Sequence, residues 1–150
     1  MNASKEQQEY VLGSSDREVE RLAYQHEVWN GETVGLWERA GIGLGSHVVD
    51  FGCGPGFCTQ ALARLVGGQG HVYALDSSDK CASIVKSEIS GTENVTFYQC
   101  DVANTKIERD SVDVVFARWL FCFLPEPAKA IKEAARILKP GGRIVILDYF

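Results

Sequence analysis

The 150-residue sequence has no apolar run that approaches the ~20 residues needed to cross a bilayer. Its first residues, Met1 to Tyr10, are polar and lack the apolar core of a secretory signal, so we expect a cytoplasmic protein. The net charge of −5 provides no electrostatic footprint for a phosphate backbone or an anionic membrane. We therefore expect neither a nucleic acid nor a membrane as partner.

Zinc-binding cysteine pairs are also missing. The five cysteines form no C-x-x-C pair, and their odd number does not suit a disulfide framework. We predict no metal site and interpret the cysteines as free thiols that pack as small apolar side chains. They are Cys53, Cys58, Cys81, Cys100 and Cys122.

Apolar residues make up 45% of the chain and charged residues 23%, which is typical of a globular domain. From residue 47 onward, short β-branched runs alternate with amphipathic stretches, and glycines end each stretch. This alternation predicts an α/β fold, a Rossmann-like doubly wound and mostly parallel sheet of about five strands. The expected strands are 47–51, 71–75, 95–99, 112–117 and 143–147, and the expected helices between them are 57–65, 78–89 and 127–138.

The residues before the sheet have a different pattern. Ser14-Ser15-Asp16 is typical of a helix N-cap, and an apolar stripe follows over 16–29. A second helix is expected over 33–40, ending at Gly41-Ile42-Gly43. We predict that residues 1–42 form a helical lid over the carboxyl ends of the strands and that residues 43–150 form the ligand-binding core.

The first expected strand ends in an acidic residue and a glycine-rich turn. Asp50 precedes Gly52, Gly54 and Gly56, which occur at alternate positions. Glycines there allow a tight strand-to-helix turn and let a ligand approach bare backbone. A carboxylate in front of such a turn repels a pyrophosphate but suits an ammonium or sulfonium group.

Two further aspartates end the next two strands. Asp76 is placed to accept hydrogen bonds from ribose hydroxyls, and Asp101 is placed to accept from the exocyclic amine of adenine, with the backbone of Val102 beside the ring. Each aspartate alone could equally cap the turn that follows it. Three of them beside a triple-glycine turn favour a ligand that contains adenosine.

Together these segments resemble the class I S-adenosylmethionine-dependent methyltransferases. The resemblance covers about 43–148, and its finer features are most similar to the small-molecule branch that includes the ubiquinone and menaquinone enzymes. It rests on the run from Val48 to Phe57, Ala74-Leu75-Asp76, Cys100-Asp101-Val102, the strand Val112 to Arg118, and the segment Ala135 to Gly142.

The resemblance implies S-adenosyl-L-methionine as cofactor, held by one group of residues for each part of the molecule. The resemblance implies that the methionine portion is bound by Asp50, Phe51, Gly52, Cys53 and Gly54. It implies that Asp76 and Ser77 bind the ribose and that Asp101 and Val102 bind the adenine. Ala117 and Arg118 would line the floor of the site beneath the sulfonium. Arg21 is expected either to pair with the cofactor carboxylate or to lie on a solvated helix face.

The expected function is therefore in-line methyl transfer to a small-molecule acceptor, which needs alignment and exclusion of water more than a catalytic side chain. No general base is identified, and His26 is interpreted as a packed structural residue. The aromatic residues Trp29, Trp37, Trp119, Phe121 and Phe123 are expected to form either an apolar acceptor pocket or core packing. Two alternatives stay open: a binding module without turnover, and, less favoured because of Asp50, a nicotinamide-dependent oxidoreductase.

The family's sheet continues with a further helix and two more strands, whereas the sequence given ends at Phe150, just after the fifth expected strand. We therefore expect either a fragment or a short natural chain. In the second case, the apolar edge at 143–147 would be covered by another copy in a homodimer.

Overall fold

The computed structural model describes residues 16–149, and its centre is a five-stranded sheet in the order β3-β2-β1-β4-β5. All four pairings between neighbouring strands are parallel. The strands are β1 (His47–Phe51), β2 (His71–Asp76), β3 (Val95–Gln99), β4 (Val112–Arg118) and β5 (Leu138–Leu147). The predicted doubly wound parallel sheet is confirmed.

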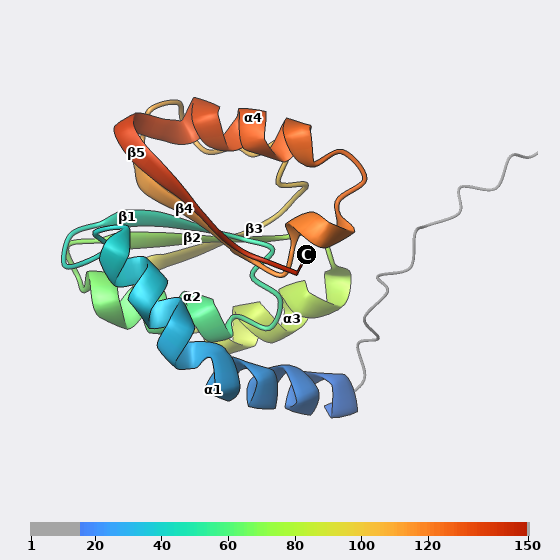
Figure 1. Cartoon of the computed structure of the whole chain (residues 1–150). Helices are drawn as coiled ribbons and strands as arrows, with labels where there is room; N and C mark the ends of the chain where they lie inside the picture. The colour runs from blue at the N-terminus through green and yellow to red at the C-terminus, as the bar shows by residue number, and fades with distance from the viewer. Residues whose placement is uncertain (1–15, 150) are drawn as a thin grey trace, which may run out of the picture.

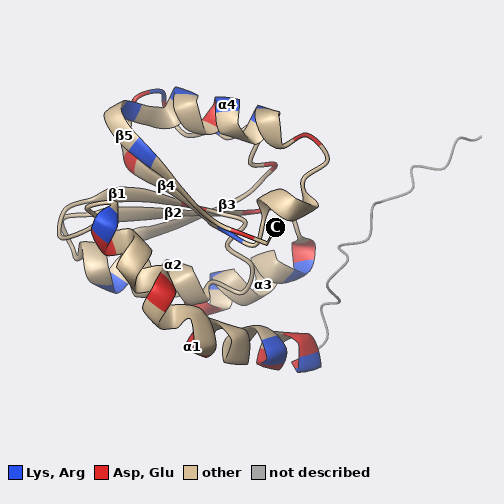
Figure 2. Cartoon of the chain, in the orientation of Figure 1, with Lys and Arg blue, Asp and Glu red and all other residues tan. Residues whose placement is uncertain are grey.

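Helices cover both faces of this sheet. On one face lie α1 (Asp16–Arg39), α2 (Phe57–Val66) and α3 (Asp79–Glu88), and on the other lies α4 (Pro127–Ile137) (Figure 1). The charged residues of α4 are spread along its surface in Figure 2, as expected for a helix that turns only one stripe toward the core.

Alternate residues of the central strands pack against opposite layers. Val48 belongs to the core on the α2 side, together with Leu62 of α2, whereas Val49 belongs to the core on the α4 side, together with Ala134 of α4. Because both faces are covered, the strands are nearly continuous apolar runs, which is why they could be recognised in the sequence.

The prediction of two N-terminal helices is wrong, because α1 is one continuous helix of 24 residues. Gly31 lies inside it, and a glycine in a helix interior costs only about 1 kcal/mol relative to alanine. Contacts on both sides of the glycine offset this cost: the Thr33 hydroxyl donates to the Trp29 carbonyl at 2.8 Å, and Trp37 is only 1% exposed. The predicted cap at Ser14-Ser15 lies outside the described residues.

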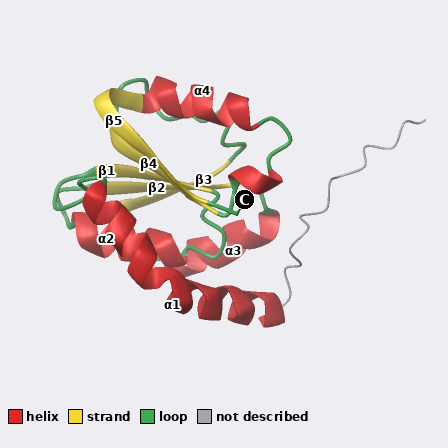
Figure 3. Ribbon diagram, in the orientation of Figure 1, coloured by secondary structure: helices red, strands yellow, loops and turns green. Residues whose placement is uncertain are grey.

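Two connections differ from regular structure. Residues 100–111, too polar for a helix, run as an irregular segment between β3 and β4 (Figure 3). After α4 the chain enters β5 at once, earlier than the predicted residue 143, and the pairing with β4 shifts register between Val112 and Val114. Gly141 has a φ of 81° at this irregularity, where the sequence predicted a turn. Among residues 16–149, no helix combines the length and apolar character needed to cross a membrane.

Candidate active site

The turn between β1 and α2 requires glycine for two separate reasons. Gly52 and Gly54 have φ angles of 66° and 54°, in the left-handed region that L-residues with a side chain seldom adopt. A Cβ at Gly52 would lie 2.8 Å from Cδ1 of Leu120, whereas a Cβ at Gly54 would meet no atom within 4 Å. The Gly54 backbone therefore borders open space, which lets another molecule approach it closely.

Asp50 is a buried acid directly in front of this turn. It is 2% exposed and accepts a hydrogen bond from the Thr59 hydroxyl, in α2, at 2.7 Å. Burial raises the pKa of its carboxyl to about 6, while the Thr59 hydrogen bond and the positive charge of Arg118 act in the opposite direction. At neutral pH Asp50 is thus a negative charge with little protein compensation, which suits a cationic ligand.

Asp76 ties the glycine turn to the end of β2. Its carboxylate accepts from the backbone N–H of Gly54 at 2.9 Å and from that of Ser78 at 2.9 Å. Burial raises the pKa of Asp76, and these backbone hydrogen bonds lower it. A carboxylate offers about four lone-pair sites, so Asp76 keeps acceptor capacity for a further donor.

Asp101 is exposed and accepts from the backbone N–H of Ala103 at 2.8 Å, so it closes its own turn. Val102, the next residue, is 5% exposed and packs in the core on the α4 side. The sequence allowed two roles for Asp101, binding a ligand or capping the turn that follows it. The structure shows the turn-capping hydrogen bond.

Two adjacent cavities at the carboxyl ends of the strands share Gly52. We call them the first and the second cavity. The walls of the first cavity come from the glycine turn, the ends of β1 and β4, the helices α1, α2 and α3, and the segments after β4 and β5. The first cavity is lined by Arg21, Leu22, Gln25, Asp50, Gly52, Cys53, Gly54, Pro55, Phe57, Cys58, Cys81, Arg118, Trp119, Phe123 and Tyr149. The second is lined by Gly52, Asp76, Ser77, Cys100, Asp101, Val102, Leu120 and Leu124.

Most residues that the sequence singled out therefore lie in the walls of these two cavities. Among the residues assigned to the cofactor, the exceptions are Phe51 and Ala117, whose side chains are fully buried in the core on the α4 side. Arg21 lines the first cavity, but its guanidinium also pairs with Glu18, with Nε donating at 2.9 Å. Arg21 thus lies both at the cavity, as the cofactor-binding alternative predicted, and on an exposed helix face, as the other alternative predicted.

The aromatic residues divide between cavity and core. Trp119 has a left-handed φ of 52°, and its ring stacks on Tyr149 at 5.9 Å between centroids and meets Trp29 edge-on at 6.2 Å. Trp119 and Phe123 line the first cavity. Trp37 does not, because it is buried against Phe116 with the ring centroids 5.4 Å apart. The acceptor-pocket alternative is therefore wrong for Trp37, which is a core residue.

Several contributors were missed by sequence reasoning. Thr59, Gln25 and Tyr149 are brought to the site by the fold; Gln25 donates through Nε2 to the Tyr149 hydroxyl at 2.7 Å across 124 positions. Only Thr59 had a signal, since a hydroxyl in the first turn of the helix after the glycine turn lies within reach of Asp50.

The cysteines are free, as predicted. Three of them, Cys53, Cys58 and Cys81, line the first cavity, and burial raises the pKa of each thiol. They are therefore protonated, weakly polar wall residues at neutral pH. Over the described part of the chain, no group of three or more potential ligands is placed to hold a metal ion.

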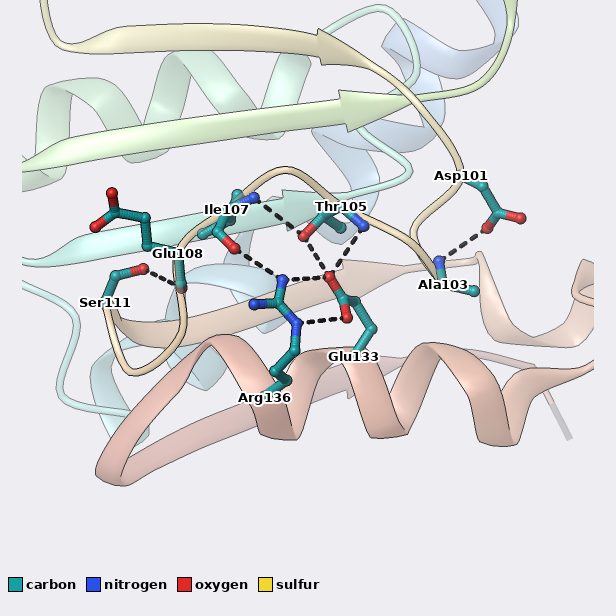
Figure 4. A network of polar contacts seen from close by, with 8 residues as sticks. All are labelled: Asp101, Ala103, Thr105, Ile107, Glu108, Ser111, Glu133 and Arg136. Atoms are coloured by element: carbon teal, nitrogen blue, oxygen red, sulfur yellow. Dashed lines mark hydrogen bonds and ion pairs between the residues drawn. The ribbon is translucent and has the colours of Figure 1, made fainter.

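A polar network holds the irregular segment that follows Asp101 (Figure 4). The Glu133 carboxylate, in α4, accepts from the Thr105 backbone N–H at 2.9 Å and from the Thr105 hydroxyl at 2.6 Å. Arg136 donates to Glu133 and to the Ile107 carbonyl, the latter at 2.7 Å. Because Val102 in the second cavity belongs to the same segment, this network supports one wall of the site.

Comparisons with known proteins agree with this geometry. Residues 49–146 match a family model described as a methyltransferase domain. A demethylmenaquinone methyltransferase from Staphylococcus aureus is 31% identical over 97% of this chain and 61% of its own length. The chain thus spans about three fifths of the length of the curated relatives it matches.

Solved structures show the same fold. A SAM-dependent methyltransferase from Aquifex aeolicus is 28% identical, with a TM-score of 0.72 over 77% of this chain and 62% of that one. An arsenic(III) S-adenosylmethionine methyltransferase from Chlamydomonas reinhardtii is also 28% identical, with a TM-score of 0.65 over 71% of this chain and 39% of that one. From the matched domain, the sheet and the glycine turn together, the chain belongs to the methyltransferase domain family and has the class I S-adenosylmethionine-dependent methyltransferase fold.

Proposed function

We propose that this chain binds S-adenosylmethionine across the two cavities and transfers its methyl group to a small-molecule acceptor. The observation that carries this is the pair of cavities that meet at Gly52, with a buried Asp50 at one and Asp76 at the other. Membership of the methyltransferase domain family supports the same reaction class and argues against the nicotinamide alternative.

The residues present fit this cofactor. Asp50 supplies negative charge for the ammonium group, and the open space at Gly54 admits the methionine chain close to backbone. Asp76 retains acceptor capacity for ribose hydroxyls in the second cavity, where Asp101 and Val102 border the place for adenine. When bound, S-adenosylmethionine would supply a methyl group attached to a positively charged sulfur. The methyl group passes to the acceptor, and the sulfur keeps the electron pair of the broken bond.

The chain's own contribution is binding, orientation and exclusion of water. Phe57, Trp119, Phe123 and Tyr149 provide aromatic walls in the first cavity, which favour an apolar planar acceptor. A proton-abstracting group is needed only where the acceptor atom carries a proton. The relatives named above act on acceptors as different as demethylmenaquinone and arsenic(III), so the acceptor's identity has to be found by assay.

Calorimetric titration with S-adenosylmethionine, S-adenosylhomocysteine and NAD tests the cofactor. We expect the first two to bind and NAD not to bind; binding of NAD alone would overturn the proposal. Turnover against a panel of quinols, phenols and amines then separates an enzyme from a binding module, because a module binds the cofactor and methylates none of them.

Replacing Asp76 by alanine is expected to weaken S-adenosylhomocysteine binding by about 1–3 kcal/mol, because hydrogen bonds to a carboxylate are lost in a buried site. The same change frees the Gly54 and Ser78 backbone N–H groups, so circular dichroism must first establish that the variant is folded. Asp79→Ala, on the exposed first turn of α3, is the matched control. An unchanged affinity in folded Asp76→Ala would remove Asp76 from the site.

We also propose a cytoplasmic protein that pairs with a second copy through β5. This strand lies at one end of the sheet order, and Ile144 and Ile146 on it are 37% and 40% exposed. Elution as a dimer in size-exclusion chromatography at micromolar concentration is expected, and elution as a monomer would contradict the pairing.

A further inference from the structure

His26 makes a hydrogen bond that allows only one protonation state. Its Nδ1 lies 3.0 Å from Nη2 of Arg118, across 92 positions of sequence. A guanidinium has donors and no acceptor, so Nδ1 must accept and the ring must be neutral, with its proton on Nε2. The ring also stacks on Phe57 of α2 with 5.6 Å between centroids, which fixes its plane.

Arg118 joins α1 to the end of β4 at two points. Besides the bond to His26, its Nη1 donates to the Thr33 hydroxyl at 3.1 Å, and its guanidinium lies 4.5 Å from the Trp119 ring centroid. Arg118 and Trp119 both line the first cavity. The orientation of this arginine in the cavity wall therefore depends on acceptors supplied by α1.

The first half of α1 has few other attachments. In this half, from Asp16 to Glu27, no side chain is fully buried, whereas Thr33 and Trp37 in the second half are. Yet this first half supplies Arg21, Leu22 and Gln25 to the first cavity. This half is held by half-buried side chains and by polar contacts to the rest of the fold that include the hydrogen bond between Gln25 and Tyr149 and the one between His26 and Arg118.

We infer that His26 is a positioning residue whose neutral ring helps to hold Arg118 and the first half of α1 against the cofactor cavity, and whose protonation breaks this contact. This inference rests on the proposed function, because it assumes that the first cavity holds the methionine portion of the cofactor. His26 itself does not line the cavity and acts through Arg118.

The charges around His26 favour the neutral ring. Burial lowers its pKa below the ordinary value of 6.5, Arg118 and Arg64 lower it further, and only Glu27 acts in the opposite direction. The Cys58 thiol, 4.0 Å from Nδ1, carries no charge. Because the folded-state pKa lies below 6.5, the contact is fully formed at pH 6.5 and above and is lost as the pH falls through that lowered pKa.

Two substitutions separate the hydrogen bond from the packing. His26→Asn places an acceptor near the position of Nδ1 and does not titrate, whereas His26→Phe keeps an aromatic ring against Phe57 and has no acceptor. Binding of S-adenosylhomocysteine to the full chain is measured by calorimetry from pH 8 down to the lowest pH at which circular dichroism shows both proteins folded. At pH 8 we expect His26→Asn to bind S-adenosylhomocysteine as wild type does. We expect His26→Phe to bind it about fivefold or more weakly than wild type, which is the usual scale of coupling between two sites.

The decisive readout is the ratio of the dissociation constants of wild type and His26→Asn as a function of pH. Asp50 also titrates near pH 6, but it is present in both proteins, so the direct effect of its own titration on binding is common to both. We expect the ratio to rise about fivefold or more as the pH falls through the lowered pKa of His26. A ratio that stays flat overturns the inference even though the cofactor binds, whereas absence of binding to wild type at pH 8 overturns the proposed function.

A measurement on the wild-type protein alone guards against variants that fail to fold. The ¹⁵N chemical shifts of the His26 ring at pH 8 are expected to show a proton on Nε2 and none on Nδ1. A proton on Nδ1 would exclude the hydrogen bond from Arg118 and overturn the inference.

Discussion

Asp50→Asn is expected to make the protein more stable and a weaker binder at the same time. Asp50 is 2% exposed, and burial raises its pKa from 3.8 to about 6. A shift of this size corresponds to a cost of about 3 kcal/mol to the folded state at neutral pH. The asparagine removes the buried charge but still buries a polar amide, which offsets part of the gain. We therefore expect the free energy of unfolding, measured with urea at pH 7.5, to rise by about 1–2 kcal/mol.

The pH dependence of this gain identifies its cause. Because the folded-state pKa of Asp50 is raised, the contribution of this residue to stability is fully present below pH 3.8 and is lost as the pH rises through about 6. The difference between Asp50→Asn and wild type should therefore shrink at pH 4.5. A gain that is equal at pH 4.5 and 7.5 would mean that charge burial is not responsible.

Binding by the same variant should change in the opposite direction. The proposed partner of Asp50 is the ammonium group of the cofactor, and loss of a buried charge pair costs about 2–4 kcal/mol. Calorimetry at pH 7.5 should then show S-adenosylhomocysteine affinity reduced roughly 30-fold or more. Retention of wild-type affinity would remove Asp50 from the cofactor site while leaving its effect on stability intact.

Glu133→Ala is expected to destabilise the protein by about 2–4 kcal/mol, because it strands the buried Thr105 N–H and hydroxyl and leaves Arg136 without its partner. Hydrogen bonds from Arg136 and Thr105 hold the pKa of Glu133 at about 2, below its ordinary value of 4.5. The contribution of Glu133 is therefore present above pH 4.5 and is lost as the pH falls toward 2. Urea unfolding at pH 7 and at intervals down to pH 3 measures both effects.

The matched control for this prediction is Glu126→Ala, which removes an acid from an exposed pair at the start of α4. Lys129 and Glu126 are 63% and 62% exposed in their side chains, and such pairs contribute little. We expect a change within about 0.5 kcal/mol for Glu126→Ala. Equal effects of the two substitutions would show that the network in Figure 4 carries no special stabilising role.

The parts of the fold that follow from local pattern were predictable. β1 was located to the residue because a strand covered on both faces is nearly continuously apolar, and β3, at the edge of the sheet, was located by its β-branched and aromatic residues. The aspartates at the ends of β1 and β2 were likewise visible, because a polar residue after an apolar run marks the edge of the sheet. By contrast, the prediction divided α1 in two. The local sequence around Gly31 does not show that Trp37, further along the helix, is buried in the core and stabilises one continuous helix.

The contacts that complete the site were not predictable in the same way. The partners His26 and Arg118 are 92 positions apart, and Gln25 and Tyr149 are 124 apart. No periodicity relates residues at such separations, since only the order of the strands in the sheet brings them together. Trp37 illustrates the same limit, because an aromatic residue suits a cavity wall and a core equally well until its neighbours are known.

The meeting of the two cavities at Gly52 has a consequence for the lifetime of the protein. Their walls come from segments as distant as Arg21 and Tyr149, and they exist together only when β1, β2 and β4 are paired. A ligand that spans both cavities therefore binds the folded chain and not the unfolded one, and mass action shifts the population toward the folded form. The supply of that ligand in the cell would then help to set how much of the chain escapes proteolysis.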